Sequence, residues 1–295
     1  MLLSMPAILL HYRGYRLWLQ AGNCRILARA MNPTTNIAVR AARKAGAIIM
    51  RSFSRVETLN VAEKQSNDFV SEIDRAAEEA ILDTIRRAYP HHAILAEESG
   101  SHAGNEYQWI IDPLDGTTNY LHGLPQFSVS IALQHRDELI SAVVYDPVRD
   151  EMFTASRGNG ALLNDRRLRV SQQRTLKGAL IGTGIPFRDQ RYLDSYLAMM
   201  RAMISDTAGI RRPGSAALDF AWVAAGRMDG FWELGLSAWD FAAGNLIVRE
   251  AGGVVSDIRG GSRQLESGNV IAGNLKVHAE MVRRLAPHVP EAMRF

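Results

Sequence analysis

Apolar residues recur every three or four positions in two stretches of the chain, which predicts two amphipathic helices. The first spans residues 33–53 and is capped by Thr35 or Asn36. Its apolar face consists of Ile37, Ala41, Ala45, Ile48 and Ile49. The second begins after a polar stretch, where Ser71 and Asp74 resemble a capping box with aspartate in place of glutamate, and it ends before a proline. Its apolar face consists of Ile73, Ala77, Ile81 and Ile85.

The pattern then changes to short apolar runs of strand length. Residues 93–96 and 108–111 form two such runs, and acidic residues follow each of them at once. Three further strands are expected at 127–133, 139–145 and 151–155. Their connections are polar or contain proline or glycine, which is typical of an antiparallel meander.

In the second half of the chain, strands and helices are mixed without a regular alternation. The predicted strands are 179–183, 231–233, 254–256 and 270–272. The predicted helices are 190–204, 214–225, 241–250 and 275–286. This order of elements favours an α+β or mixed α/β sandwich. We expect two lobes, residues 31–175 and 176–295, that work as a single functional unit.

The composition is that of a globular protein, with 47% hydrophobic and 22% charged residues. No apolar run reaches the roughly 20 residues that a membrane-spanning helix needs. The sequence contains one cysteine, which excludes a disulfide framework and a cysteine-based zinc site. Such cysteine usage favours a reducing, cytoplasmic setting.

The first thirty residues differ from the rest of the chain. They hold four arginines and no acid, so the formal net charge of +3 falls to −1 over residues 31–295. A body this close to neutral gives no charge argument for binding nucleic acid. The arginines follow the apolar run, unlike those of a signal peptide. A basic amphipathic helix over residues 15–29 would suit a membrane surface. We expect instead that residues 1–30 lie outside the folded core, upstream of a translation start at Met31.

Acidic residues lie at the ends of several predicted elements. Glu97 follows one strand, and Asp112 and Asp115 follow the next. Asp240 precedes a helix near the end of the chain. Because ligand sites collect outside the carboxyl ends of strands, we expect these four side chains to share a pocket. Two carboxylates about 5 Å apart repel by roughly 3 kcal/mol at an effective dielectric of about 20. Protons or cations must therefore neutralise such a group.

The residues around these acids indicate which cation and which reaction. Oxygen ligands without histidine or cysteine select a hard ion such as Mg²⁺ over zinc. Pro113 stiffens the loop, and the Leu114 carbonyl is a further hard ligand. Gly116 and Thr117 are expected to open a short helix, whose free amides suit a phosphate and whose threonine hydroxyl can hold a water. Together these features favour metal-assisted phosphoryl transfer to water.

Each of these acids also has a purely structural interpretation. Taken alone, the segment 112–117 is compatible with an Asp-capped turn, and Glu97 with a solvated loop end. Asp240 is compatible with a helix N-cap. Asp74 is compatible with a first-turn acid that the helix dipole favours. The residues by themselves leave both interpretations open.

Two longer motifs resemble the signatures of the inositol monophosphatase family. The sequence WIIDPLDGTTN, residues 109–119, resembles the first signature, and WDFAAG at 239–244, continuing to Gly253, resembles the second. The resemblance covers about residues 31–290, and segments 66–70 and 211–217 are most similar to the bacterial SuhB type. It implies a five-layered αβαβα sandwich, a homodimer and inhibition by lithium.

The resemblance also implies roles for individual residues. The implied ligands of two or three Mg²⁺ ions are Glu97, Asp112, the Leu114 carbonyl, Asp115 and Asp240. The implied catalytic residues are Thr117 paired with Asp74, which activate the attacking water, and Glu97, which assists them. The implied substrate contacts are Glu97, Leu114, Asp115, Gly116, Thr117, Arg211, Gly214, Ser215, Ala216, Glu233 and Asp240.

Other phosphatase groups fit the motifs less well. Haloacid-dehalogenase phosphatases use a D-x-D-G-T motif with an aspartate nucleophile, whereas Asp112 and Asp115 are three positions apart. Fructose bisphosphatases and nucleotide 3′-phosphatases share the metal core. The sequence of residues 116–119 nevertheless fits the inositol branch better.

Two functions of different classes are compatible with this resemblance. The first is Mg²⁺-dependent hydrolysis of myo-inositol 1-phosphate or a related small phosphomonoester, by direct attack of a metal-activated water. The second is transcription antitermination on ribosomal RNA operons through NusA and RNA polymerase, in which SuhB-type proteins are implicated. Neither function implies sequence-specific nucleic-acid binding or a membrane partner.

Overall fold

The computed structural model describes the chain except for residues 1–7, 13–14, 20–31, 57–62, 187–189 and 294–295. The chain forms two compact units, Met1–Asn32 and Pro33–Phe295. In the first unit, strands β1 (Ile8–Tyr12) and β2 (Tyr15–Leu19) pair antiparallel. The alternative of a basic helix over 15–29 is therefore wrong for residues 15–19, where tyrosine and tryptophan favour a strand. The rest of that prediction lies outside the described residues.

The second unit begins with two long helices, α1 (Pro33–Val56) and α2 (Glu63–Ala88). Proline suits the first helical turn because no intrahelical partner is needed for its missing N–H. Thr35 and Asn36 thus lie inside α1, and neither is its cap. Buried Thr35 instead shares hydroxyl hydrogen bonds with Ser141 (2.7 Å) and Ser156 (2.8 Å) of the neighbouring sheet.

The expected start of α2 at Ser71 is also wrong. The helix begins at Glu63, so the proposed capping box lies within it. The polar stretch before Ser71 contains glutamate, lysine and glutamine, which are good helix formers. A search for hydrophobic periodicity cannot detect helix in this stretch, because the residues from Glu63 to Asp68 are all polar.

An eight-stranded sheet follows, in the order β10-β9-β8-β7-β6-β5-β3-β4. Its strands are β3 (Ala93–Ala96), β4 (Gly100–His102), β5 (Tyr107–Asp115), β6 (Ser128–His135), β7 (Glu138–Asp146), β8 (Glu151–Ser156), β9 (Gly160–Leu163) and β10 (Arg166–Arg167). The strands β5 to β10 pair antiparallel, which confirms the meander, and β3 pairs parallel with β5. The register of β5 against β6 shifts between Asp112 and Asp115.

A second, five-stranded sheet has the order β12-β11-β13-β15-β14. Its strands are β11 (Leu180–Thr183), β12 (Gly209–Arg211), β13 (Gly230–Glu233), β14 (Val254–Asp257) and β15 (Val270–Gly273). The remaining α-helices are α3 (Thr117–Leu121), α4 (Leu193–Ile204), α5 (Ala216–Ala224), α6 (Ala238–Glu250), α7 (Gln264–Ser267) and α8 (Leu275–Leu285). The expected elements of this half are present, and the short strand β12 and the short helix α7 were not predicted.

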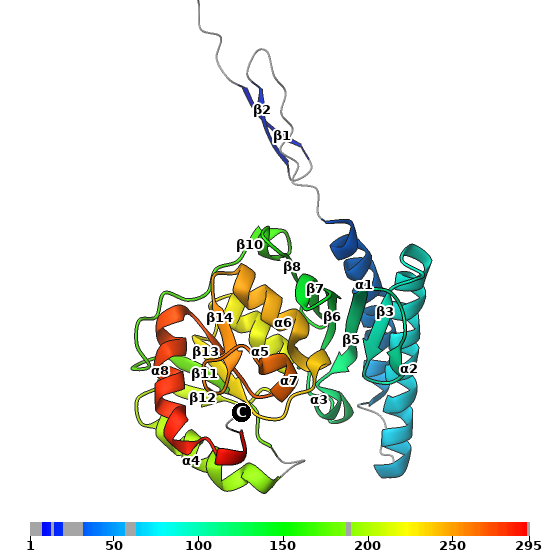
Figure 1. Ribbon diagram of the computed structural model, residues 1–295. Coiled ribbons are helices and arrows are strands. Elements are labelled where there is room, and N and C mark those ends of the chain that lie inside the picture. The colour runs from blue at the N-terminus through cyan, green and yellow to red at the C-terminus, as the bar shows by residue number, and fades with distance from the viewer. Residues whose placement is uncertain (1–7, 13–14, 20–31, 57–62, 187–189, 294–295) are drawn as a thin grey trace, which may run out of the picture. The chain divides into compact units, whose positions relative to one another are not determined.

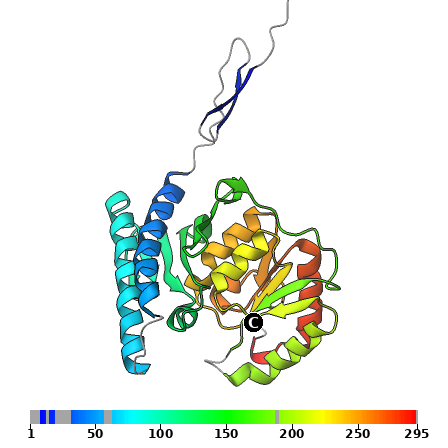
Figure 2. The same ribbon diagram turned by 180° about the vertical axis from the view of Figure 1, so that it is seen from behind.

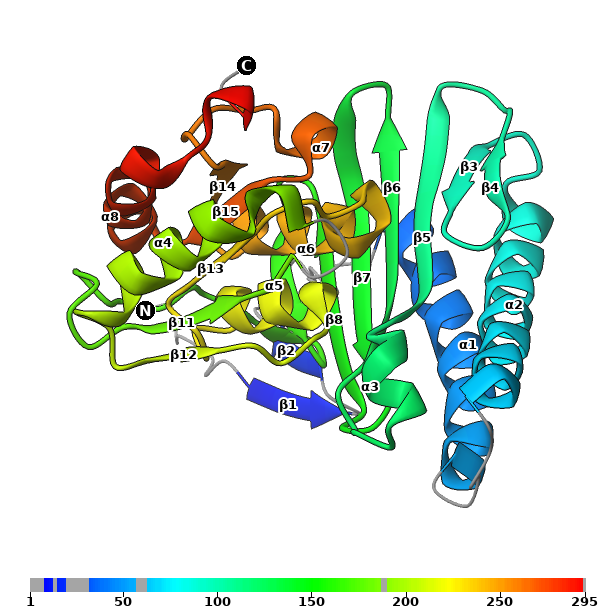
Figure 3. The same ribbon diagram turned by 90° about the horizontal axis from the view of Figure 1, so that it is seen from below.

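The sheets and helices of the second unit stack in five layers, αβαβα (Figure 1). Helices α1 and α2 cover one face of the eight-stranded sheet, and α5 and α6 lie between the two sheets. Helices α4 and α8 cover the outer face of the second sheet, as the views from behind and from below also show (Figures 2 and 3). Separate apolar clusters fill these interfaces. The expected fold is confirmed.

None of the helices described has both the length and the apolar character needed to cross a bilayer.

Candidate active site

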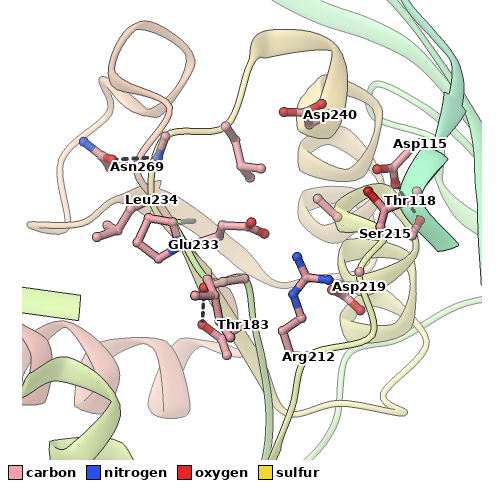
Figure 4. A pocket seen from close by; sticks show the side chains of 18 of the residues that line it. Asp115, Thr118, Thr183, Arg212, Ser215, Asp219, Glu233, Leu234, Asp240 and Asn269 are labelled. Carbon is pink, nitrogen blue, oxygen red and sulfur yellow. Dashed lines mark hydrogen bonds between the residues drawn. The ribbon is translucent and has the colours of Figure 1, made fainter. Parts of the chain in front are cut away.

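A cavity of about 410 Å³ lies where β5, β11 and β13 meet the N-terminal ends of α3, α5 and α6. Figure 4 shows side chains from these elements pointing toward one another across it. The predicted site residues that line it are Glu97, Asp112, Leu114, Asp115, Gly116, Thr117, Gly214, Ser215, Ala216, Glu233 and Asp240. The structure therefore brings together residues from well-separated segments of the sequence.

Two predicted residues lie elsewhere. Arg211 lines a second cavity with Arg149 and Trp222, and its neighbour Arg212 lines both cavities. Successive side chains of an extended segment point to opposite sides, which accounts for the absence of Arg211 from the lining of the first cavity. Asp74 is buried on α2 and does not line the cavity, although the charges of Glu97 and Glu98 act on it.

The segment that follows Ile111 is held by hydrogen bonds within itself. The Leu114 amide donates to Asp112 Oδ1 (2.9 Å), and the Thr117 hydroxyl donates to the Leu114 carbonyl (3.1 Å). Gly116 has φ 96° and caps α3. A Cβ there would lie 2.9 Å from the Gln126 carbonyl oxygen, so the turn requires glycine for both conformation and space. The expected short helix is present, but the Thr117 hydroxyl donates to Leu114 and not to Asp74.

Asp115 joins strand β5 to the start of helix α5 at the cavity. Its Oδ2 accepts hydrogen bonds from the Ser215 hydroxyl (2.5 Å) and the Ala217 amide (2.8 Å) at the start of α5. These bonds favour the charged carboxylate, but burial and the charge of Asp240 act more strongly and raise the pKa of Asp115 to about 7.

Asp112 is 2% exposed. Burial, followed by the charges of Glu97, Asp115 and Asp240, raises the pKa of Asp112 well above its ordinary value. Asp112 and Glu97 also share a side-chain hydrogen bond. The Glu97 amide donates to the Ile111 carbonyl (3.1 Å), which ties β3 to β5 directly beside Asp112.

Asp240 approaches the cavity from the first turn of α6. The helix begins at Ala238, with Ser237 as its N-cap, so Asp240 lies within the helix and the N-cap interpretation is wrong. Asp240 Oδ2 accepts a hydrogen bond from the Ser237 amide (2.7 Å). The positive end of the helix dipole stabilises an acid in this position.

The cavity carries a second group of charged residues, with Glu233 on β13 and Asp219 on α5 (Figure 4). Burial, then the charges of Asp115 and Asp240, raise the pKa of Glu233 to about 8, and Arg212 partly offsets them. Asp219 is fully buried nearby, and its pKa is raised well above the ordinary value by burial and by Glu233. The sequence analysis missed Arg212 and Asp219. The one available signal for Asp219 was its place one helical turn after Ser215.

The donor set of the cavity fits a hard divalent cation. In the described part of the chain, no group of three or more His, Cys, Asp or Glu side chains is arranged so that it could hold a metal ion as it stands. The acids that line the cavity nevertheless offer only oxygen donors. The charges of Asp115 and Asp240 raise the pKa of Asp112, and the charge of Asp240 raises the pKa of Asp115. Asp74 Oδ1 is buried and has no hydrogen-bond partner among the described residues. A cation would offset both the desolvation of these carboxylates and their mutual repulsion.

Comparison with known proteins supports the two signatures in the sequence. A family model described as "Inositol monophosphatase family" matches residues 30–292. The chain belongs to the inositol monophosphatase family. The match spans the described core from α1 to the last turn of the chain, and the family identifies the chain as a phosphatase.

Individual members of the inositol monophosphatase family are similar over most of this chain. Nus factor SuhB of Pseudomonas aeruginosa is 55% identical over 270 residues, which cover 90% of this chain and 100% of the relative. The structure of the extragenic suppressor protein SuhB from Bartonella henselae is 43% identical, with a TM-score of 0.81, and covers 88% of this chain and 100% of its own. The inositol monophosphatase from Anabaena is 39% identical, with a TM-score of 0.79, and covers 88% and 97%.

Proposed function

We propose that the protein hydrolyses myo-inositol 1-phosphate or a related small phosphomonoester in the presence of Mg²⁺. The observation that carries this proposal is the convergence of Glu97, Asp112, Asp115 and Asp240 on one cavity. Asp112 and Asp115 are buried and Glu97 and Asp240 half-buried, and such a group of carboxylates is costly unless a cation neutralises its charge. The name of the Anabaena relative, inositol monophosphatase, supports the choice of substrate.

The four acids and the Leu114 carbonyl would hold two or three Mg²⁺ ions. When bound, the ions supply a water nucleophile at neutral pH and stabilise the charge of the leaving oxygen. The Thr117 hydroxyl gives its hydrogen to the Leu114 carbonyl, so its own oxygen remains able to accept a hydrogen bond from the attacking water. In this proposal Asp74, paired with Thr117, accepts the proton of that water, and Glu97 assists.

The phosphate and the alcohol would occupy different ends of the cavity. The backbone amides of Gly116 and Thr117 begin α3 and have no partner within the helix, so they suit phosphate oxygens. Gly214, Ser215 and Ala216 form the start of α5 beside them. Across the cavity, the Glu233 carboxylate would accept hydrogen bonds from ring hydroxyls. Arg212, which lines the cavity, would contact the substrate from the segment where the sequence predicts Arg211 to do so.

The substitution Asp112→Asn tests this proposal because it removes one charge from the centre of the acid group without changing its size. Phosphate release from a panel of phosphomonoesters should depend on Mg²⁺ in the unmodified protein and fall at least a hundredfold in the variant. Asp137→Asn, at an exposed turn, is the matched control and should be unaffected. Unchanged Mg²⁺-dependent release by Asp112→Asn would contradict the proposal.

A second function is supported by the name of the Pseudomonas relative, Nus factor SuhB, at 55% identity. We propose that the protein also acts in transcription antitermination on ribosomal RNA operons, in the cytoplasm and as a homodimer, through NusA and RNA polymerase. Retention of purified NusA or polymerase by the purified protein tests this role, and sedimentation tests the dimer. A metal-site variant such as Asp112→Asn should still bind these partners, because the proposed role requires no chemistry.

A further inference from the structure

Helix α2 presents a second buried acid, Glu78, to the turn that carries Glu97. Glu78 is 3% exposed. Its Oε2 accepts a hydrogen bond from the Glu98 amide (2.9 Å), and its Oε1 accepts one from the Ser99 amide (2.9 Å). Both carboxylate oxygens are thus bound to the two peptide groups that directly follow Glu97.

The backbone of Glu97 is therefore held on both sides. Its own amide donates to the Ile111 carbonyl of β5 (3.1 Å), next to Asp112. The amides that follow it are bound to α2 through Glu78. With the backbone fixed in this way, the direction of the Glu97 side chain toward Asp112 depends on few remaining torsions. We propose that Glu78 is a positioning residue for Glu97 and thereby sets the affinity of the cavity for Mg²⁺.

The chemistry of Glu78 fits this task better than that of a neutral residue. Two neighbouring amide donors need two acceptor oxygens at the end of one side chain, and only a carboxylate offers them. A carboxylate also adds a negative charge to the site. The pKa values of Glu98 and Asp74 are raised mainly by burial, and the charge of Glu78 raises them further. A site that gains a divalent cation nearby can tolerate this charge, because the cation offsets it.

Helix α2 consequently supports the site at two points. Asp74 and Glu78 are four residues apart, so they lie on the same face of the helix. The charge of Glu97 acts on Asp74, and Glu78 accepts hydrogen bonds from the peptide groups that follow Glu97. A rigid helix that fixes a ligand-bearing turn lowers the cost of ordering that turn when a metal binds.

This inference rests on the proposed Mg²⁺ site, and its test is a Mg²⁺ titration read by thermal unfolding of the full-length protein. In Glu78→Gln, one acceptor becomes an amide donor that faces a backbone N–H. The half-saturating Mg²⁺ concentration should rise 10- to 100-fold, the range seen when a group that orients a metal ligand is removed. The KM for phosphomonoester at saturating Mg²⁺ should stay within about twofold. Glu79→Gln, the same change at an exposed position of α2, should match the unmodified protein.

The double variant Glu78→Gln/Glu97→Gln separates positioning from general stability. If Glu78 acts through Glu97, it should add no further loss of Mg²⁺ response once Glu97 is already changed. If Glu78→Gln does not fold, Glu78→Asp is the alternative variant. It keeps the charge on a side chain that is shorter by one methylene, and the half-saturating Mg²⁺ concentration should rise by a smaller factor.

An unaltered Mg²⁺ response in the folded Glu78 variants, or an effect that adds fully to that of Glu97→Gln, would overturn the inference and leave the proposed function intact. A lack of any Mg²⁺ response in the unmodified protein would contradict the proposed function as well. The two failures are therefore distinguishable.

Discussion

Single residues that carry no charge also shape the cavity, and Gly184 is the clearest case. A Cβ at this position would lie 1.7 Å from Glu233 Oε1 and 1.9 Å from its Cδ. Gly184→Ala must therefore displace the Glu233 carboxylate. We expect the KM for myo-inositol 1-phosphate to rise about tenfold, equivalent to roughly 1.4 kcal/mol of binding, with a smaller change in kcat. Gly209→Ala is the control, because its nearest neighbour is the flexible end of Arg211.

The raised pKa of Glu233 predicts a pH dependence of folding. Its pKa is 4.5 in the unfolded chain and about 8 in the folded one, chiefly through burial. Between these values the folded protein binds the extra proton, so the free energy of unfolding should fall as pH rises from about 5 to 8, by up to about 1.4 kcal/mol per unit for one group. Denaturant titrations in the presence of a chelator should show a shallower fall for Glu233→Gln. Parallel pH profiles for the two proteins would contradict the assignment.

The predicted residues that line the cavity lie either within the two signatures or at positions that the family resemblance implied, such as Glu97 and Glu233. A continuous motif such as residues 112–117 constrains its own turn, and the structure places Asp112 and residues 114–117 at one cavity. Arg212, Asp219 and Gly184 were missed for a physical reason. Their place in the cavity depends on how α5, β11 and β13 pack together, and such long-range packing leaves no local pattern.

At the scale of elements, the short helix α3 is fastened to the segment that precedes α5. Asn119 Nδ2 donates to the Gln126 carbonyl (2.8 Å) and to the Pro213 carbonyl (2.8 Å). Asn119→Ala removes both bonds from a buried position and leaves two carbonyls unpaired. The free energy of unfolding should fall by about 2–4 kcal/mol, measured by denaturant titration. The control is Asn105→Ala. Asn105 is exposed and accepts one hydrogen bond from the Tyr107 amide, so this substitution should lower the free energy of unfolding by less than half as much.

Element boundaries show where hydrophobic pattern alone was insufficient. The meander and most helices of the C-terminal half follow the expected ranges because one face of each is buried. The first turns of α2 and α6 were missed, since their residues are polar or face the active site. The strands β4, β10 and β12 are two or three residues long, too short for an alternation to be visible.

At the scale of the whole molecule, residues 1–32 form a unit separate from the layered core. Deletion of residues 1–30 should therefore leave the unfolding midpoint and the Mg²⁺-dependent phosphatase activity of the core within error. Thermal unfolding and phosphate release by the shortened and full-length proteins measure this. A clear loss of either property would show that the first unit contributes to the core.

The stacking of the layers required more than periodicity. Strand β12 pairs with β11 although α4 separates them in sequence, and β3 pairs with β5 on one side as well as with β4 on the other. These non-local pairings decide which strand ends face α5 and α6, and hence which acids meet. The family resemblance supplied this arrangement, because nothing in the local pattern specifies it.

The central claim is that four acids from three distant segments jointly bind divalent cations. Crystals grown with Mn²⁺ as a substitute for Mg²⁺ allow the metal to be located by its anomalous scattering. We expect anomalous peaks in the cavity, within bonding distance of Glu97, Asp112, Asp115 and Asp240. Peaks confined to other sites, or none at a Mn²⁺ concentration that supports phosphate release, would contradict it.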